Sequence, residues 1–189
     1  MDASVAGSGD IRYVDVNEDG VVDGEDRTQI GDPYADFMIG WNLALNYKNF
    51  DFNAFVYASV GGDVYRAYER NLNYTNRFAG TLDRWTGEGT SNTYPRLTNN
   101  DPNNNFSNPS DFYLQDGDYF RIKTIQVGYS LPNVTIKQVG ITKARIYITA
   151  ENLFTFTEYT GYDPEIGGGI DKGYYPQAMT VLVGLNVQF

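Results

Sequence analysis

The 189-residue sequence contains no cysteine and no histidine, and each absence excludes a class of function. Without cysteine the chain has no disulfide framework, zinc ribbon or thiol nucleophile, and without histidine it has no His-based catalytic triad or ordinary catalytic zinc site. Basic residues are also few, since 14 Lys and Arg stand against 24 Asp and Glu and the formal charge is −10. Phosphate binding needs a clustered basic surface, so nucleic acid is excluded as a partner.

Long apolar runs are missing too, because no stretch approaches the roughly 18 residues of a membrane-spanning helix. The opening MDASVAGSGD lacks the basic and apolar regions of a signal peptide, so we expect a cytosolic protein or one whose beginning is missing. The sequence is instead rich in tyrosine and glycine, with 16 Tyr and 20 Gly. This composition favours a single β domain with long loops.

Alternation of apolar and polar residues predicts five strands, near residues 37–47, 50–60, 118–131, 143–156 and 179–189. The first two form a hairpin around Lys48-Asn49, because one register places Tyr47 opposite Phe50 and Trp41 opposite Val56 on one face, while the other face is mostly polar. In the third strand the apolar phase shifts between Ile122 and Ile125, which predicts a β-bulge.

The connections alternate in length along the chain. The short ones are Lys48-Asn49 and residues 132–142, whereas the long ones are residues 61–117 and 157–178, with residues 1–36 as a third long segment. If the strands run up and down, all long segments lie at one end, which is the pattern of transmembrane β-barrels. Five strands cannot close a barrel, so on this interpretation the chain is a piece. A soluble sheet with one buried face has the same alternation and stays open as an alternative.

The stretch DVNEDGVVDGED, residues 15–26, has the spacing of a twelve-residue calcium loop. Gly20 stands at the sharp turn, and the segment lacks a flanking pair of amphipathic helices, so we expect the ion to stiffen a loop rather than to open a helix pair. Asp at the twelfth position, where an EF-hand has Glu, resembles the dockerin variant of this loop. The predicted ligands are Asp15, Asn17, Asp19, Val21 (by its carbonyl), Asp23 and Asp26.

Two further groups of residues suggest contact with sugars. Aromatic side chains crowd residues 61–117, and flat aromatic faces suit carbohydrate, although for any single one of them packing within the loop is the favoured explanation. The candidate contacts are Tyr65, Tyr68, Trp85 and Tyr94. Asp163 and Glu165 form a carboxylate pair of the kind that glycosidases use, but carboxylates in a glycine-rich loop are usually just solvated.

Four ordered segments resemble the C-terminal end of SusC/RagA-type TonB-dependent outer-membrane transporters of Bacteroidota. They are GDIRYVDVNEDGVVDGEDRTQIGDPYADFMIGWNLALNYKNFD, then DGDYFRIKTIQVGYSLP, then ARIYITAENLFTFTEYTGYDPE, and finally YYPQAMTVLVGLNVQF. The resemblance covers nearly the whole chain from Gly9 to Phe189. It implies an all-β fold, an antiparallel up-and-down sheet that forms the last five strands of a barrel of about 22 strands, closed by a plug.

The resemblance also implies a location in the cell outer membrane and a set of partners. These are the rest of the barrel and its plug, a SusD-like lipoprotein as a lid, the TonB complex, and an oligosaccharide or peptide cargo. We expect residues 1–36 to form an extracellular loop and residues 37–189 the barrel part. The chain lacks a signal sequence, a TonB-contacting segment and a plug, so by itself it should transport nothing.

In the family the terminal strand ends in an aromatic residue that the barrel-assembly machinery recognises. Val183, Leu185, Val187 and Phe189 match that signal at alternate positions. We therefore expect a barrel segment of a nutrient transporter, not an enzyme. The alternatives are a soluble cell-surface β module that binds calcium and carbohydrate, and a glycoside hydrolase that uses Asp163 and Glu165.

Overall fold

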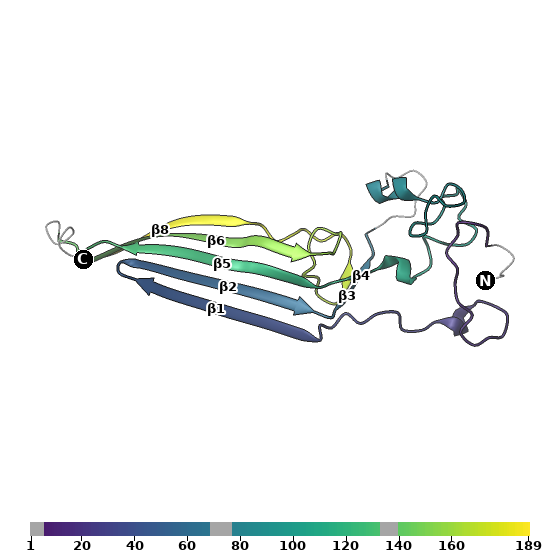
Figure 1. Ribbon diagram of the computed structural model, residues 1–189, viewed down its shortest axis with the longest axis horizontal. Coiled ribbons are helices and arrows are strands. Elements are labelled where there is room, and N and C mark those ends of the chain that lie inside the picture. The colour runs from purple at the N-terminus through teal and green to yellow at the C-terminus, as the bar shows by residue number, and fades with distance from the viewer. Residues whose placement is uncertain (1–5, 69–76, 133–139) are drawn as a thin grey trace.

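The computed structural model describes residues 6–68, 77–132 and 140–189. Its main element is a sheet of five antiparallel strands in the order β1-β2-β5-β6-β8, drawn as the long ribbon of Figure 1. The strands are β1 (Phe37–Tyr47), β2 (Phe50–Val60), β5 (Tyr119–Ser130), β6 (Lys143–Thr157) and β8 (Thr180–Gln188). Each end differs from the expected bound by no more than one residue.

The predicted hairpin register and the predicted bulge are both confirmed. Tyr47 pairs with Phe50 and Trp41 with Val56, across a turn in which Lys48 has a φ of 55°. The register of β5 shifts against both neighbours, between Phe55 and Val56 on β2 and between Ile122 and Thr124 on β5 itself. Because of this shift, Ile122 and Ile125 lie on the same face of the sheet.

The long and short connections lie at opposite ends of the sheet. In Figure 1 the β1–β2 turn and the C-terminus are at one end, and the long segments with the N-terminus are at the other. We call the second end the loop end. The predicted short connection at residues 132–142 lies mostly outside the described residues.

A second, small sheet ties the long segments together at the loop end. It has the order β4-β3-β7, from β3 (Asp63–Arg66), β4 (Leu114–Asp116) and β7 (Ile170–Asp171). Three short 3-10 helices lie in the same region: η1 (Gly24–Asp26), η2 (Ala79–Asp83) and η3 (Asp111–Tyr113). No helix within the described ranges is long and apolar enough to cross a membrane.

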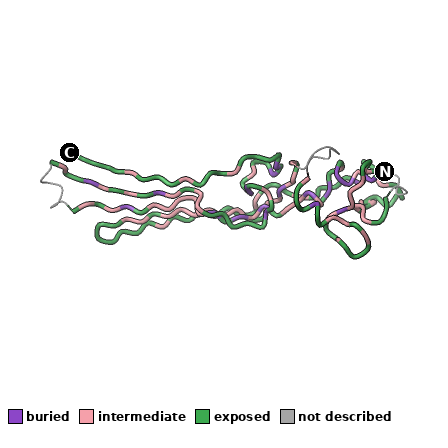
Figure 2. The backbone as a smooth tube through the Cα atoms, turned by 90° about the horizontal axis from the view of Figure 1, so that it is seen from above, coloured by how far each residue is buried: buried purple, intermediate pink, exposed green. Residues whose placement is uncertain are grey.

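Buried residues gather at the loop end rather than along the main sheet, as Figure 2 shows. Val64, Phe106, Tyr113 and Tyr159 are buried there, while large apolar side chains on the strands stay exposed, among them Trp41, Leu45 and Val183. A soluble sheet would bury such side chains against a second layer. Here the described residues provide no second layer, so the apolar surface of the sheet must meet something outside the chain.

Candidate functional site

The two faces of the main sheet differ in chemistry across all five strands. One row read across the sheet consists of Leu45, Phe52, Val127, Ile148 and Val183. The next row, on the opposite side, consists of Asn46, Asp51, Gly128, Tyr147 and Gly184. We call the first side the apolar face and the second the polar face. One lipid-facing side and one lumen-facing side is the arrangement of a transmembrane barrel wall.

An ion pair crosses three strands on the polar face. Arg145 on β6 reaches over β5 to Asp51 on β2, with 2.9 Å between Nε and Oδ1, and it also donates to Gln126 at 2.9 Å. Gly128 leaves room for this crossing, because a Cβ at that position would lie 2.4 Å from both Arg145 Nη2 and Asp51 Oδ1. The ring of Tyr147 covers Gly184 in the same way on β8.

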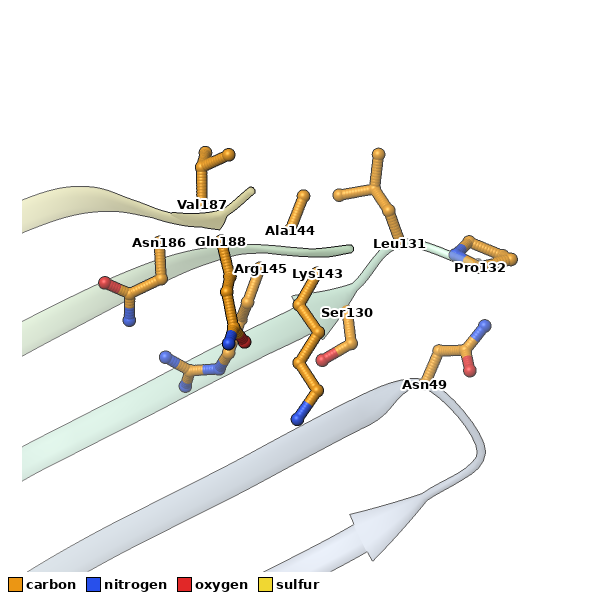
Figure 3. A pocket seen from close by; sticks show the side chains of 10 residues that line it. All are labelled: Asn49, Ser130, Leu131, Pro132, Lys143, Ala144, Arg145, Asn186, Val187 and Gln188. Atoms are coloured by element: carbon orange, nitrogen blue, oxygen red, sulfur yellow. The ribbon is translucent and has the colours of Figure 1, made fainter. Parts of the chain in front are cut away.

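A hollow of about 560 Å³ lies at the tight-turn end of the sheet, as Figure 3 shows. Polar side chains that line it include Ser130, Lys143 and Gln188, and Arg145 lines it as well. Arg145 is already engaged by Asp51 and Gln126. The hollow is therefore part of the polar wall, and its residues do not form a catalytic arrangement.

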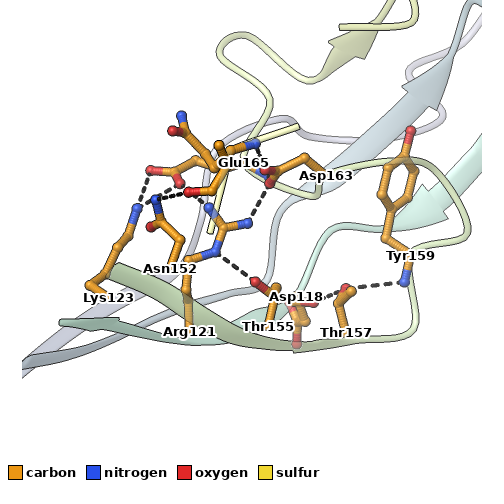
Figure 4. A network of polar contacts seen from close by, with 11 residues as sticks. Asp118, Arg121, Lys123, Asn152, Thr155, Thr157, Tyr159, Asp163 and Glu165 are labelled. Atoms are coloured by element: carbon orange, nitrogen blue, oxygen red, sulfur yellow. Dashed lines mark hydrogen bonds and ion pairs between the residues drawn. The ribbon is translucent and has the colours of Figure 1, made fainter. Parts of the chain in front are cut away.

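A network of ion pairs and hydrogen bonds lies at the loop end of the main sheet and is drawn in Figure 4. Arg121 on β5 is 2% exposed and pairs with Asp163 through Nη2 and with Glu165 through Nη1 at 2.7 Å. Its Nε donates to Thr155 on β6 at 2.8 Å. Lys123 adds a second cation, whose Nζ lies 2.7 Å from Glu165 Oε2.

Asp163 is held in its charged form by this environment. Burial disfavours its charge, but the backbone N–H groups of Gln177 and Glu165 and the Arg121 guanidinium outweigh burial, so the pKa of Asp163 lies below its ordinary value. A glycosidase acid needs the opposite, a raised pKa. Asp163 therefore does not fit the general-acid role of the hydrolase alternative, and Glu165 is paired with Arg121 and Lys123.

The acidic loop is ordered by its own backbone. Asp15 accepts hydrogen bonds from the N–H groups of Asp19 (3.2 Å) and Gly20 (2.8 Å), and Asp19 accepts one from Val21 at 2.8 Å. Asp26, at the twelfth position, accepts from Val16, Asn17 and Asp23. The hydrogen bond from Asp23, followed by those from Val16 and Asn17, lowers the pKa of Asp26.

The donor types of this loop suit calcium, but two observations bear on the fit. Among the described residues, no three Asp, Glu, His or Cys side chains gather as a metal-binding group. Asp26 also uses both carboxylate oxygens to close the loop on its own amides. Asn17, Asp19 and Asp23 remain exposed at the surface, and Asp15 is half-buried. Calcium binding stays a prediction from the ligand spacing.

The four predicted contact aromatics are packed within the loop segments. Tyr65 lies 5.5 Å from the ring of Tyr113, Tyr68 lies 5.2 Å from Phe78, and Tyr94 lies 5.1 Å from Phe112, while Trp85 covers Gly9. All four are half-buried. Outside the main strands, the described tyrosines that are freely exposed are others: Tyr34, Tyr162, Tyr174 and Tyr175. Which tyrosines are exposed depends on how the loops fold, so the amino-acid composition does not predict it.

The terminal strand presents its apolar residues at the edge of the sheet. β8 pairs with β6 on one side only, and Val183, Leu185 and Phe189 are exposed. β1 forms the other edge. Both edges therefore carry backbone groups that the main sheet does not pair, as expected for a barrel sector that continues on each side.

Comparisons with known proteins point to one class. No family model matches the chain. The TonB-dependent receptor P3 of Formosa agariphila is 35% identical over 94% of the chain, and the TonB-dependent receptor SusC of Bacteroides thetaiotaomicron is 34% identical over 94% of it. The alignments cover 19% and 17% of these two receptors. The chain thus spans about a fifth of the length of the curated relatives it matches.

Solved structures give the same result for the fold. The RagAB peptide transporter superimposes with a TM-score of 0.66 at 27% identity, over 79% of this chain and 17% of that one. The RagAB peptide importer in its open-open state superimposes with a TM-score of 0.73 at 24% identity, over 90% and 19%. The five-stranded sheet is therefore similar to part of a transporter barrel, as the apolar and polar faces indicate.

Proposed function

Because the chain belongs to the SusC/RagA family of TonB-dependent outer-membrane receptors, as a segment of the barrel, we propose that it forms wall and outer loops of a nutrient importer. The observation that carries the proposal is the apolar face that runs across all five strands opposite a polar face. The apolar face would contact lipid, the polar face would line the lumen, and the loop end would form the outer mouth. The relatives are receptors and transporters rather than enzymes.

For the complete receptor we propose import of oligosaccharides or peptides. It would act with a SusD-like lipoprotein as a lid and with the TonB complex as the source of energy. One relative is described as a peptide transporter, and another bears the name SusC, so cargo of either class is consistent with the likeness. The segment alone would transport nothing, because five strands do not enclose a pore.

The test compares the uptake of glycans and peptides by cells that carry the complete receptor with the uptake by cells from which its gene has been deleted. We expect loss of growth or uptake on one class of glycan or peptide after deletion, and loss of the same uptake when TonB is inactivated. Uptake that persists without TonB would contradict the energised-import proposal. A single soluble monomeric species of this chain in buffer without detergent would instead favour the β module that binds calcium and carbohydrate.

We also propose that the acidic loop binds calcium outside the cell, through Asp15, Asn17, Asp19, Asp23 and the Val21 carbonyl. The support is the ligand spacing and the exposure of Asn17, Asp19 and Asp23, and Asp26 would serve mainly to close the loop. Millimolar calcium suits even a weak site of this type. Binding would stiffen the segment that precedes β1.

Calorimetric titration of the purified receptor in detergent tests this proposal. We expect calcium binding in the millimolar range or tighter, weakened about 10-fold or more when Asp15 and Asp19 are both changed to Asn. Substitution of the exposed Asp83 to Asn, outside the loop, is the matched control. Equal heats for the native receptor and the double variant would exclude the site.

The terminal residues form the proposed barrel-assembly signal. An exposed apolar strand with an open edge can be recruited by strand addition, in which main-chain hydrogen bonds give affinity and alternate side chains give specificity. Val183, Leu185, Val187 and Phe189 supply those alternate side chains. Phe189 is 85% exposed, so it is free to meet a partner.

A further inference from the structure

The segment between β6 and β8, residues 158–179, folds back over the polar face of the sheet. Asp163 and Glu165 in this segment meet Arg121 and Lys123 on β5 (Figure 4). We call it the latched loop. We propose that Arg121, with Lys123 and Asn152, locks the latched loop over the lumen side of the barrel wall, where the loop forms a fixed constriction of the outer mouth. This inference rests on the proposed barrel function.

The bulge in β5 and β6 supplies two of the three anchors. Lys123 is the residue that the register of β5 skips, and opposite it β6 carries Asn152 with a φ of 51°. A bulge bends the strand and re-aims side chains. Lys123 meets Glu165, and Asn152 donates to the carbonyl of Ala178 at 3.2 Å, so both ends of the latched loop are held.

Arg121 is the central anchor because both carboxylates that pair with its charge belong to the latched loop. It is 2% exposed, and a buried guanidinium without carboxylate partners is strongly unfavourable. Both carboxylates come from the latched loop, while the strands contribute the Thr155 hydroxyl and the ring of Tyr119, whose centroid lies 5.4 Å from the guanidinium carbon. If the loop undocked, the Arg121 guanidinium would lose its carboxylate partners, Asp163 and Glu165, and the charge-assisted hydrogen bonds to them would break.

The loop is prepared for docking by its own hydrogen bonds. Asp163 accepts the backbone N–H groups of Glu165 and Gln177, both at 2.9 Å, which joins the two limbs of the loop. Asp171, only 1% exposed, accepts from the hydroxyl of Tyr159 at 2.6 Å and from the N–H of Gly173. These contacts make the loop a folded unit rather than a flexible flap.

A second attachment joins the latched loop to the other long loop. β7 pairs in parallel with β3, through Tyr65 opposite Ile170, and Thr160 contacts the Gln115 side chain of β4 at 2.9 Å. Loops that move as lids have few buried contacts. The latched loop is held by the buried Arg121–Asp163 pair and by the strand pairing of β7, so we infer that it stays in place while cargo passes.

Trypsin treatment of cells that carry the complete receptor tests the latch. Lys172 is exposed and is the only Lys or Arg after Arg145, so a single cleavage there reports on the loop. Proteolysis needs local unfolding, so the native loop should resist. We expect Arg121→Met to raise the cleavage rate at Lys172 by at least about 10-fold, because the loop loses two charge-assisted contacts.

Two further variants keep this test decisive. If Arg121→Met prevents assembly of the barrel, the loop-side variant Asp163→Asn with Glu165→Gln leaves the strands unchanged and should raise cleavage in the same way. Arg145→Met is the matched control, because it removes an Arg–Asp pair from the same face without touching the latched loop. Unchanged cleavage in the Arg121 variant and in the loop-side variant, or an equal rise in the control, would overturn the latch.

A cross-link tests whether the loop stays in place during transport. The chain has no cysteine of its own, so Lys123→Cys with Glu165→Cys can be joined by a short, reducible thiol-to-thiol cross-linker. We expect cargo uptake within about 2-fold of the reduced receptor. Uptake that stops on cross-linking and returns on reduction would show that the loop must open and would overturn the fixed constriction. If the native receptor takes up no cargo, the proposed function fails, while trypsin cleavage still reports on the latch.

Discussion

At the scale of single residues, Asp10 joins two segments that are far apart in the sequence. Its carboxylate accepts from Arg96 Nε at 2.6 Å and from Asn105 Nδ2 at 2.8 Å, and also from the Gly7 N–H. Burial disfavours its charge, but the hydrogen bonds from Arg96, Gly7 and Asn105 outweigh burial and hold the pKa of Asp10 below its ordinary value. One carboxylate thus fastens the N-terminal segment to the loop between β2 and β5.

This lowered pKa predicts how the loop end responds to acid. A carboxylate whose folded pKa is depressed stabilises the fold above its unfolded pKa and loses that contribution as the pH falls toward the folded value. We expect the contacts of Asp10 to hold at neutral pH and to weaken only below about pH 4, the unfolded pKa of Asp. Hydrogen exchange of residues 7–11 in the complete receptor measures this directly. Asp10→Asn should raise exchange at neutral pH, and Asp83→Asn, at an exposed site, should not.

Gly128 predicts a second effect at this scale. Gly128→Ala would place a methyl group where Arg145 crosses to Asp51, so the ion pair must shift or break. We expect a loss of about 1.5–3 kcal/mol in unfolding free energy, the range for a hydrogen bond to a charged group. Urea unfolding of the receptor in detergent measures it. Gly40→Ala is the control, since a Cβ there meets only Phe55, at 3.4 Å, on the same face; an equal loss in both would contradict the crossing argument.

At the scale of elements, the strands follow from local chemistry and the loop contacts do not. The hairpin at Lys48-Asn49 and the bulge near Lys123 are visible in the sequence, because a period of two fixes which side chains share a face and a break in that period marks an extra residue. The pairing of Arg121 with Asp163 is not visible, because it depends on how residues 158–179 fold. The available signal was a pair of cations in β5 and a pair of carboxylates after β6, and charge spacing alone does not say that they meet.

The terminal strand gives a prediction at this scale. Phe189→Ser removes the last apolar side chain of the alternating set while leaving the pairing of β8 with β6 intact. We expect a several-fold lower amount of receptor in the outer membrane, measured by heat-modifiable mobility of folded barrel on gels. Gln188→Ser, on the other face, is the matched control. Equal amounts of folded receptor for Phe189→Ser and the native chain would argue against the assembly signal.

At the scale of the whole molecule, the sheet has two open edges and one exposed apolar face. Such a surface associates with itself or with lipid unless the rest of a barrel covers it. We expect the isolated chain to aggregate in buffer and to disperse only in detergent, as followed by analytical ultracentrifugation. A sharp monomer peak without detergent would contradict the interpretation of the sheet as part of a membrane barrel.

The strand order described above also has a consequence for the kinetics of folding. Every strand of the main sheet pairs only with strands that are its neighbours in chain order along that sheet, so topology alone demands no crossover. The entropic cost of closing the connecting loop then decides how readily two strands pair. Each doubling of the loop length raises this free-energy cost by only about 0.6 kcal/mol. The β1–β2 joint closes across two residues, whereas the β2–β5 joint must bring together strands separated by the whole of the long outer segment. The contacts between Phe50–Val60 and Tyr119–Ser130 should therefore form more slowly than those of the β1–β2 hairpin.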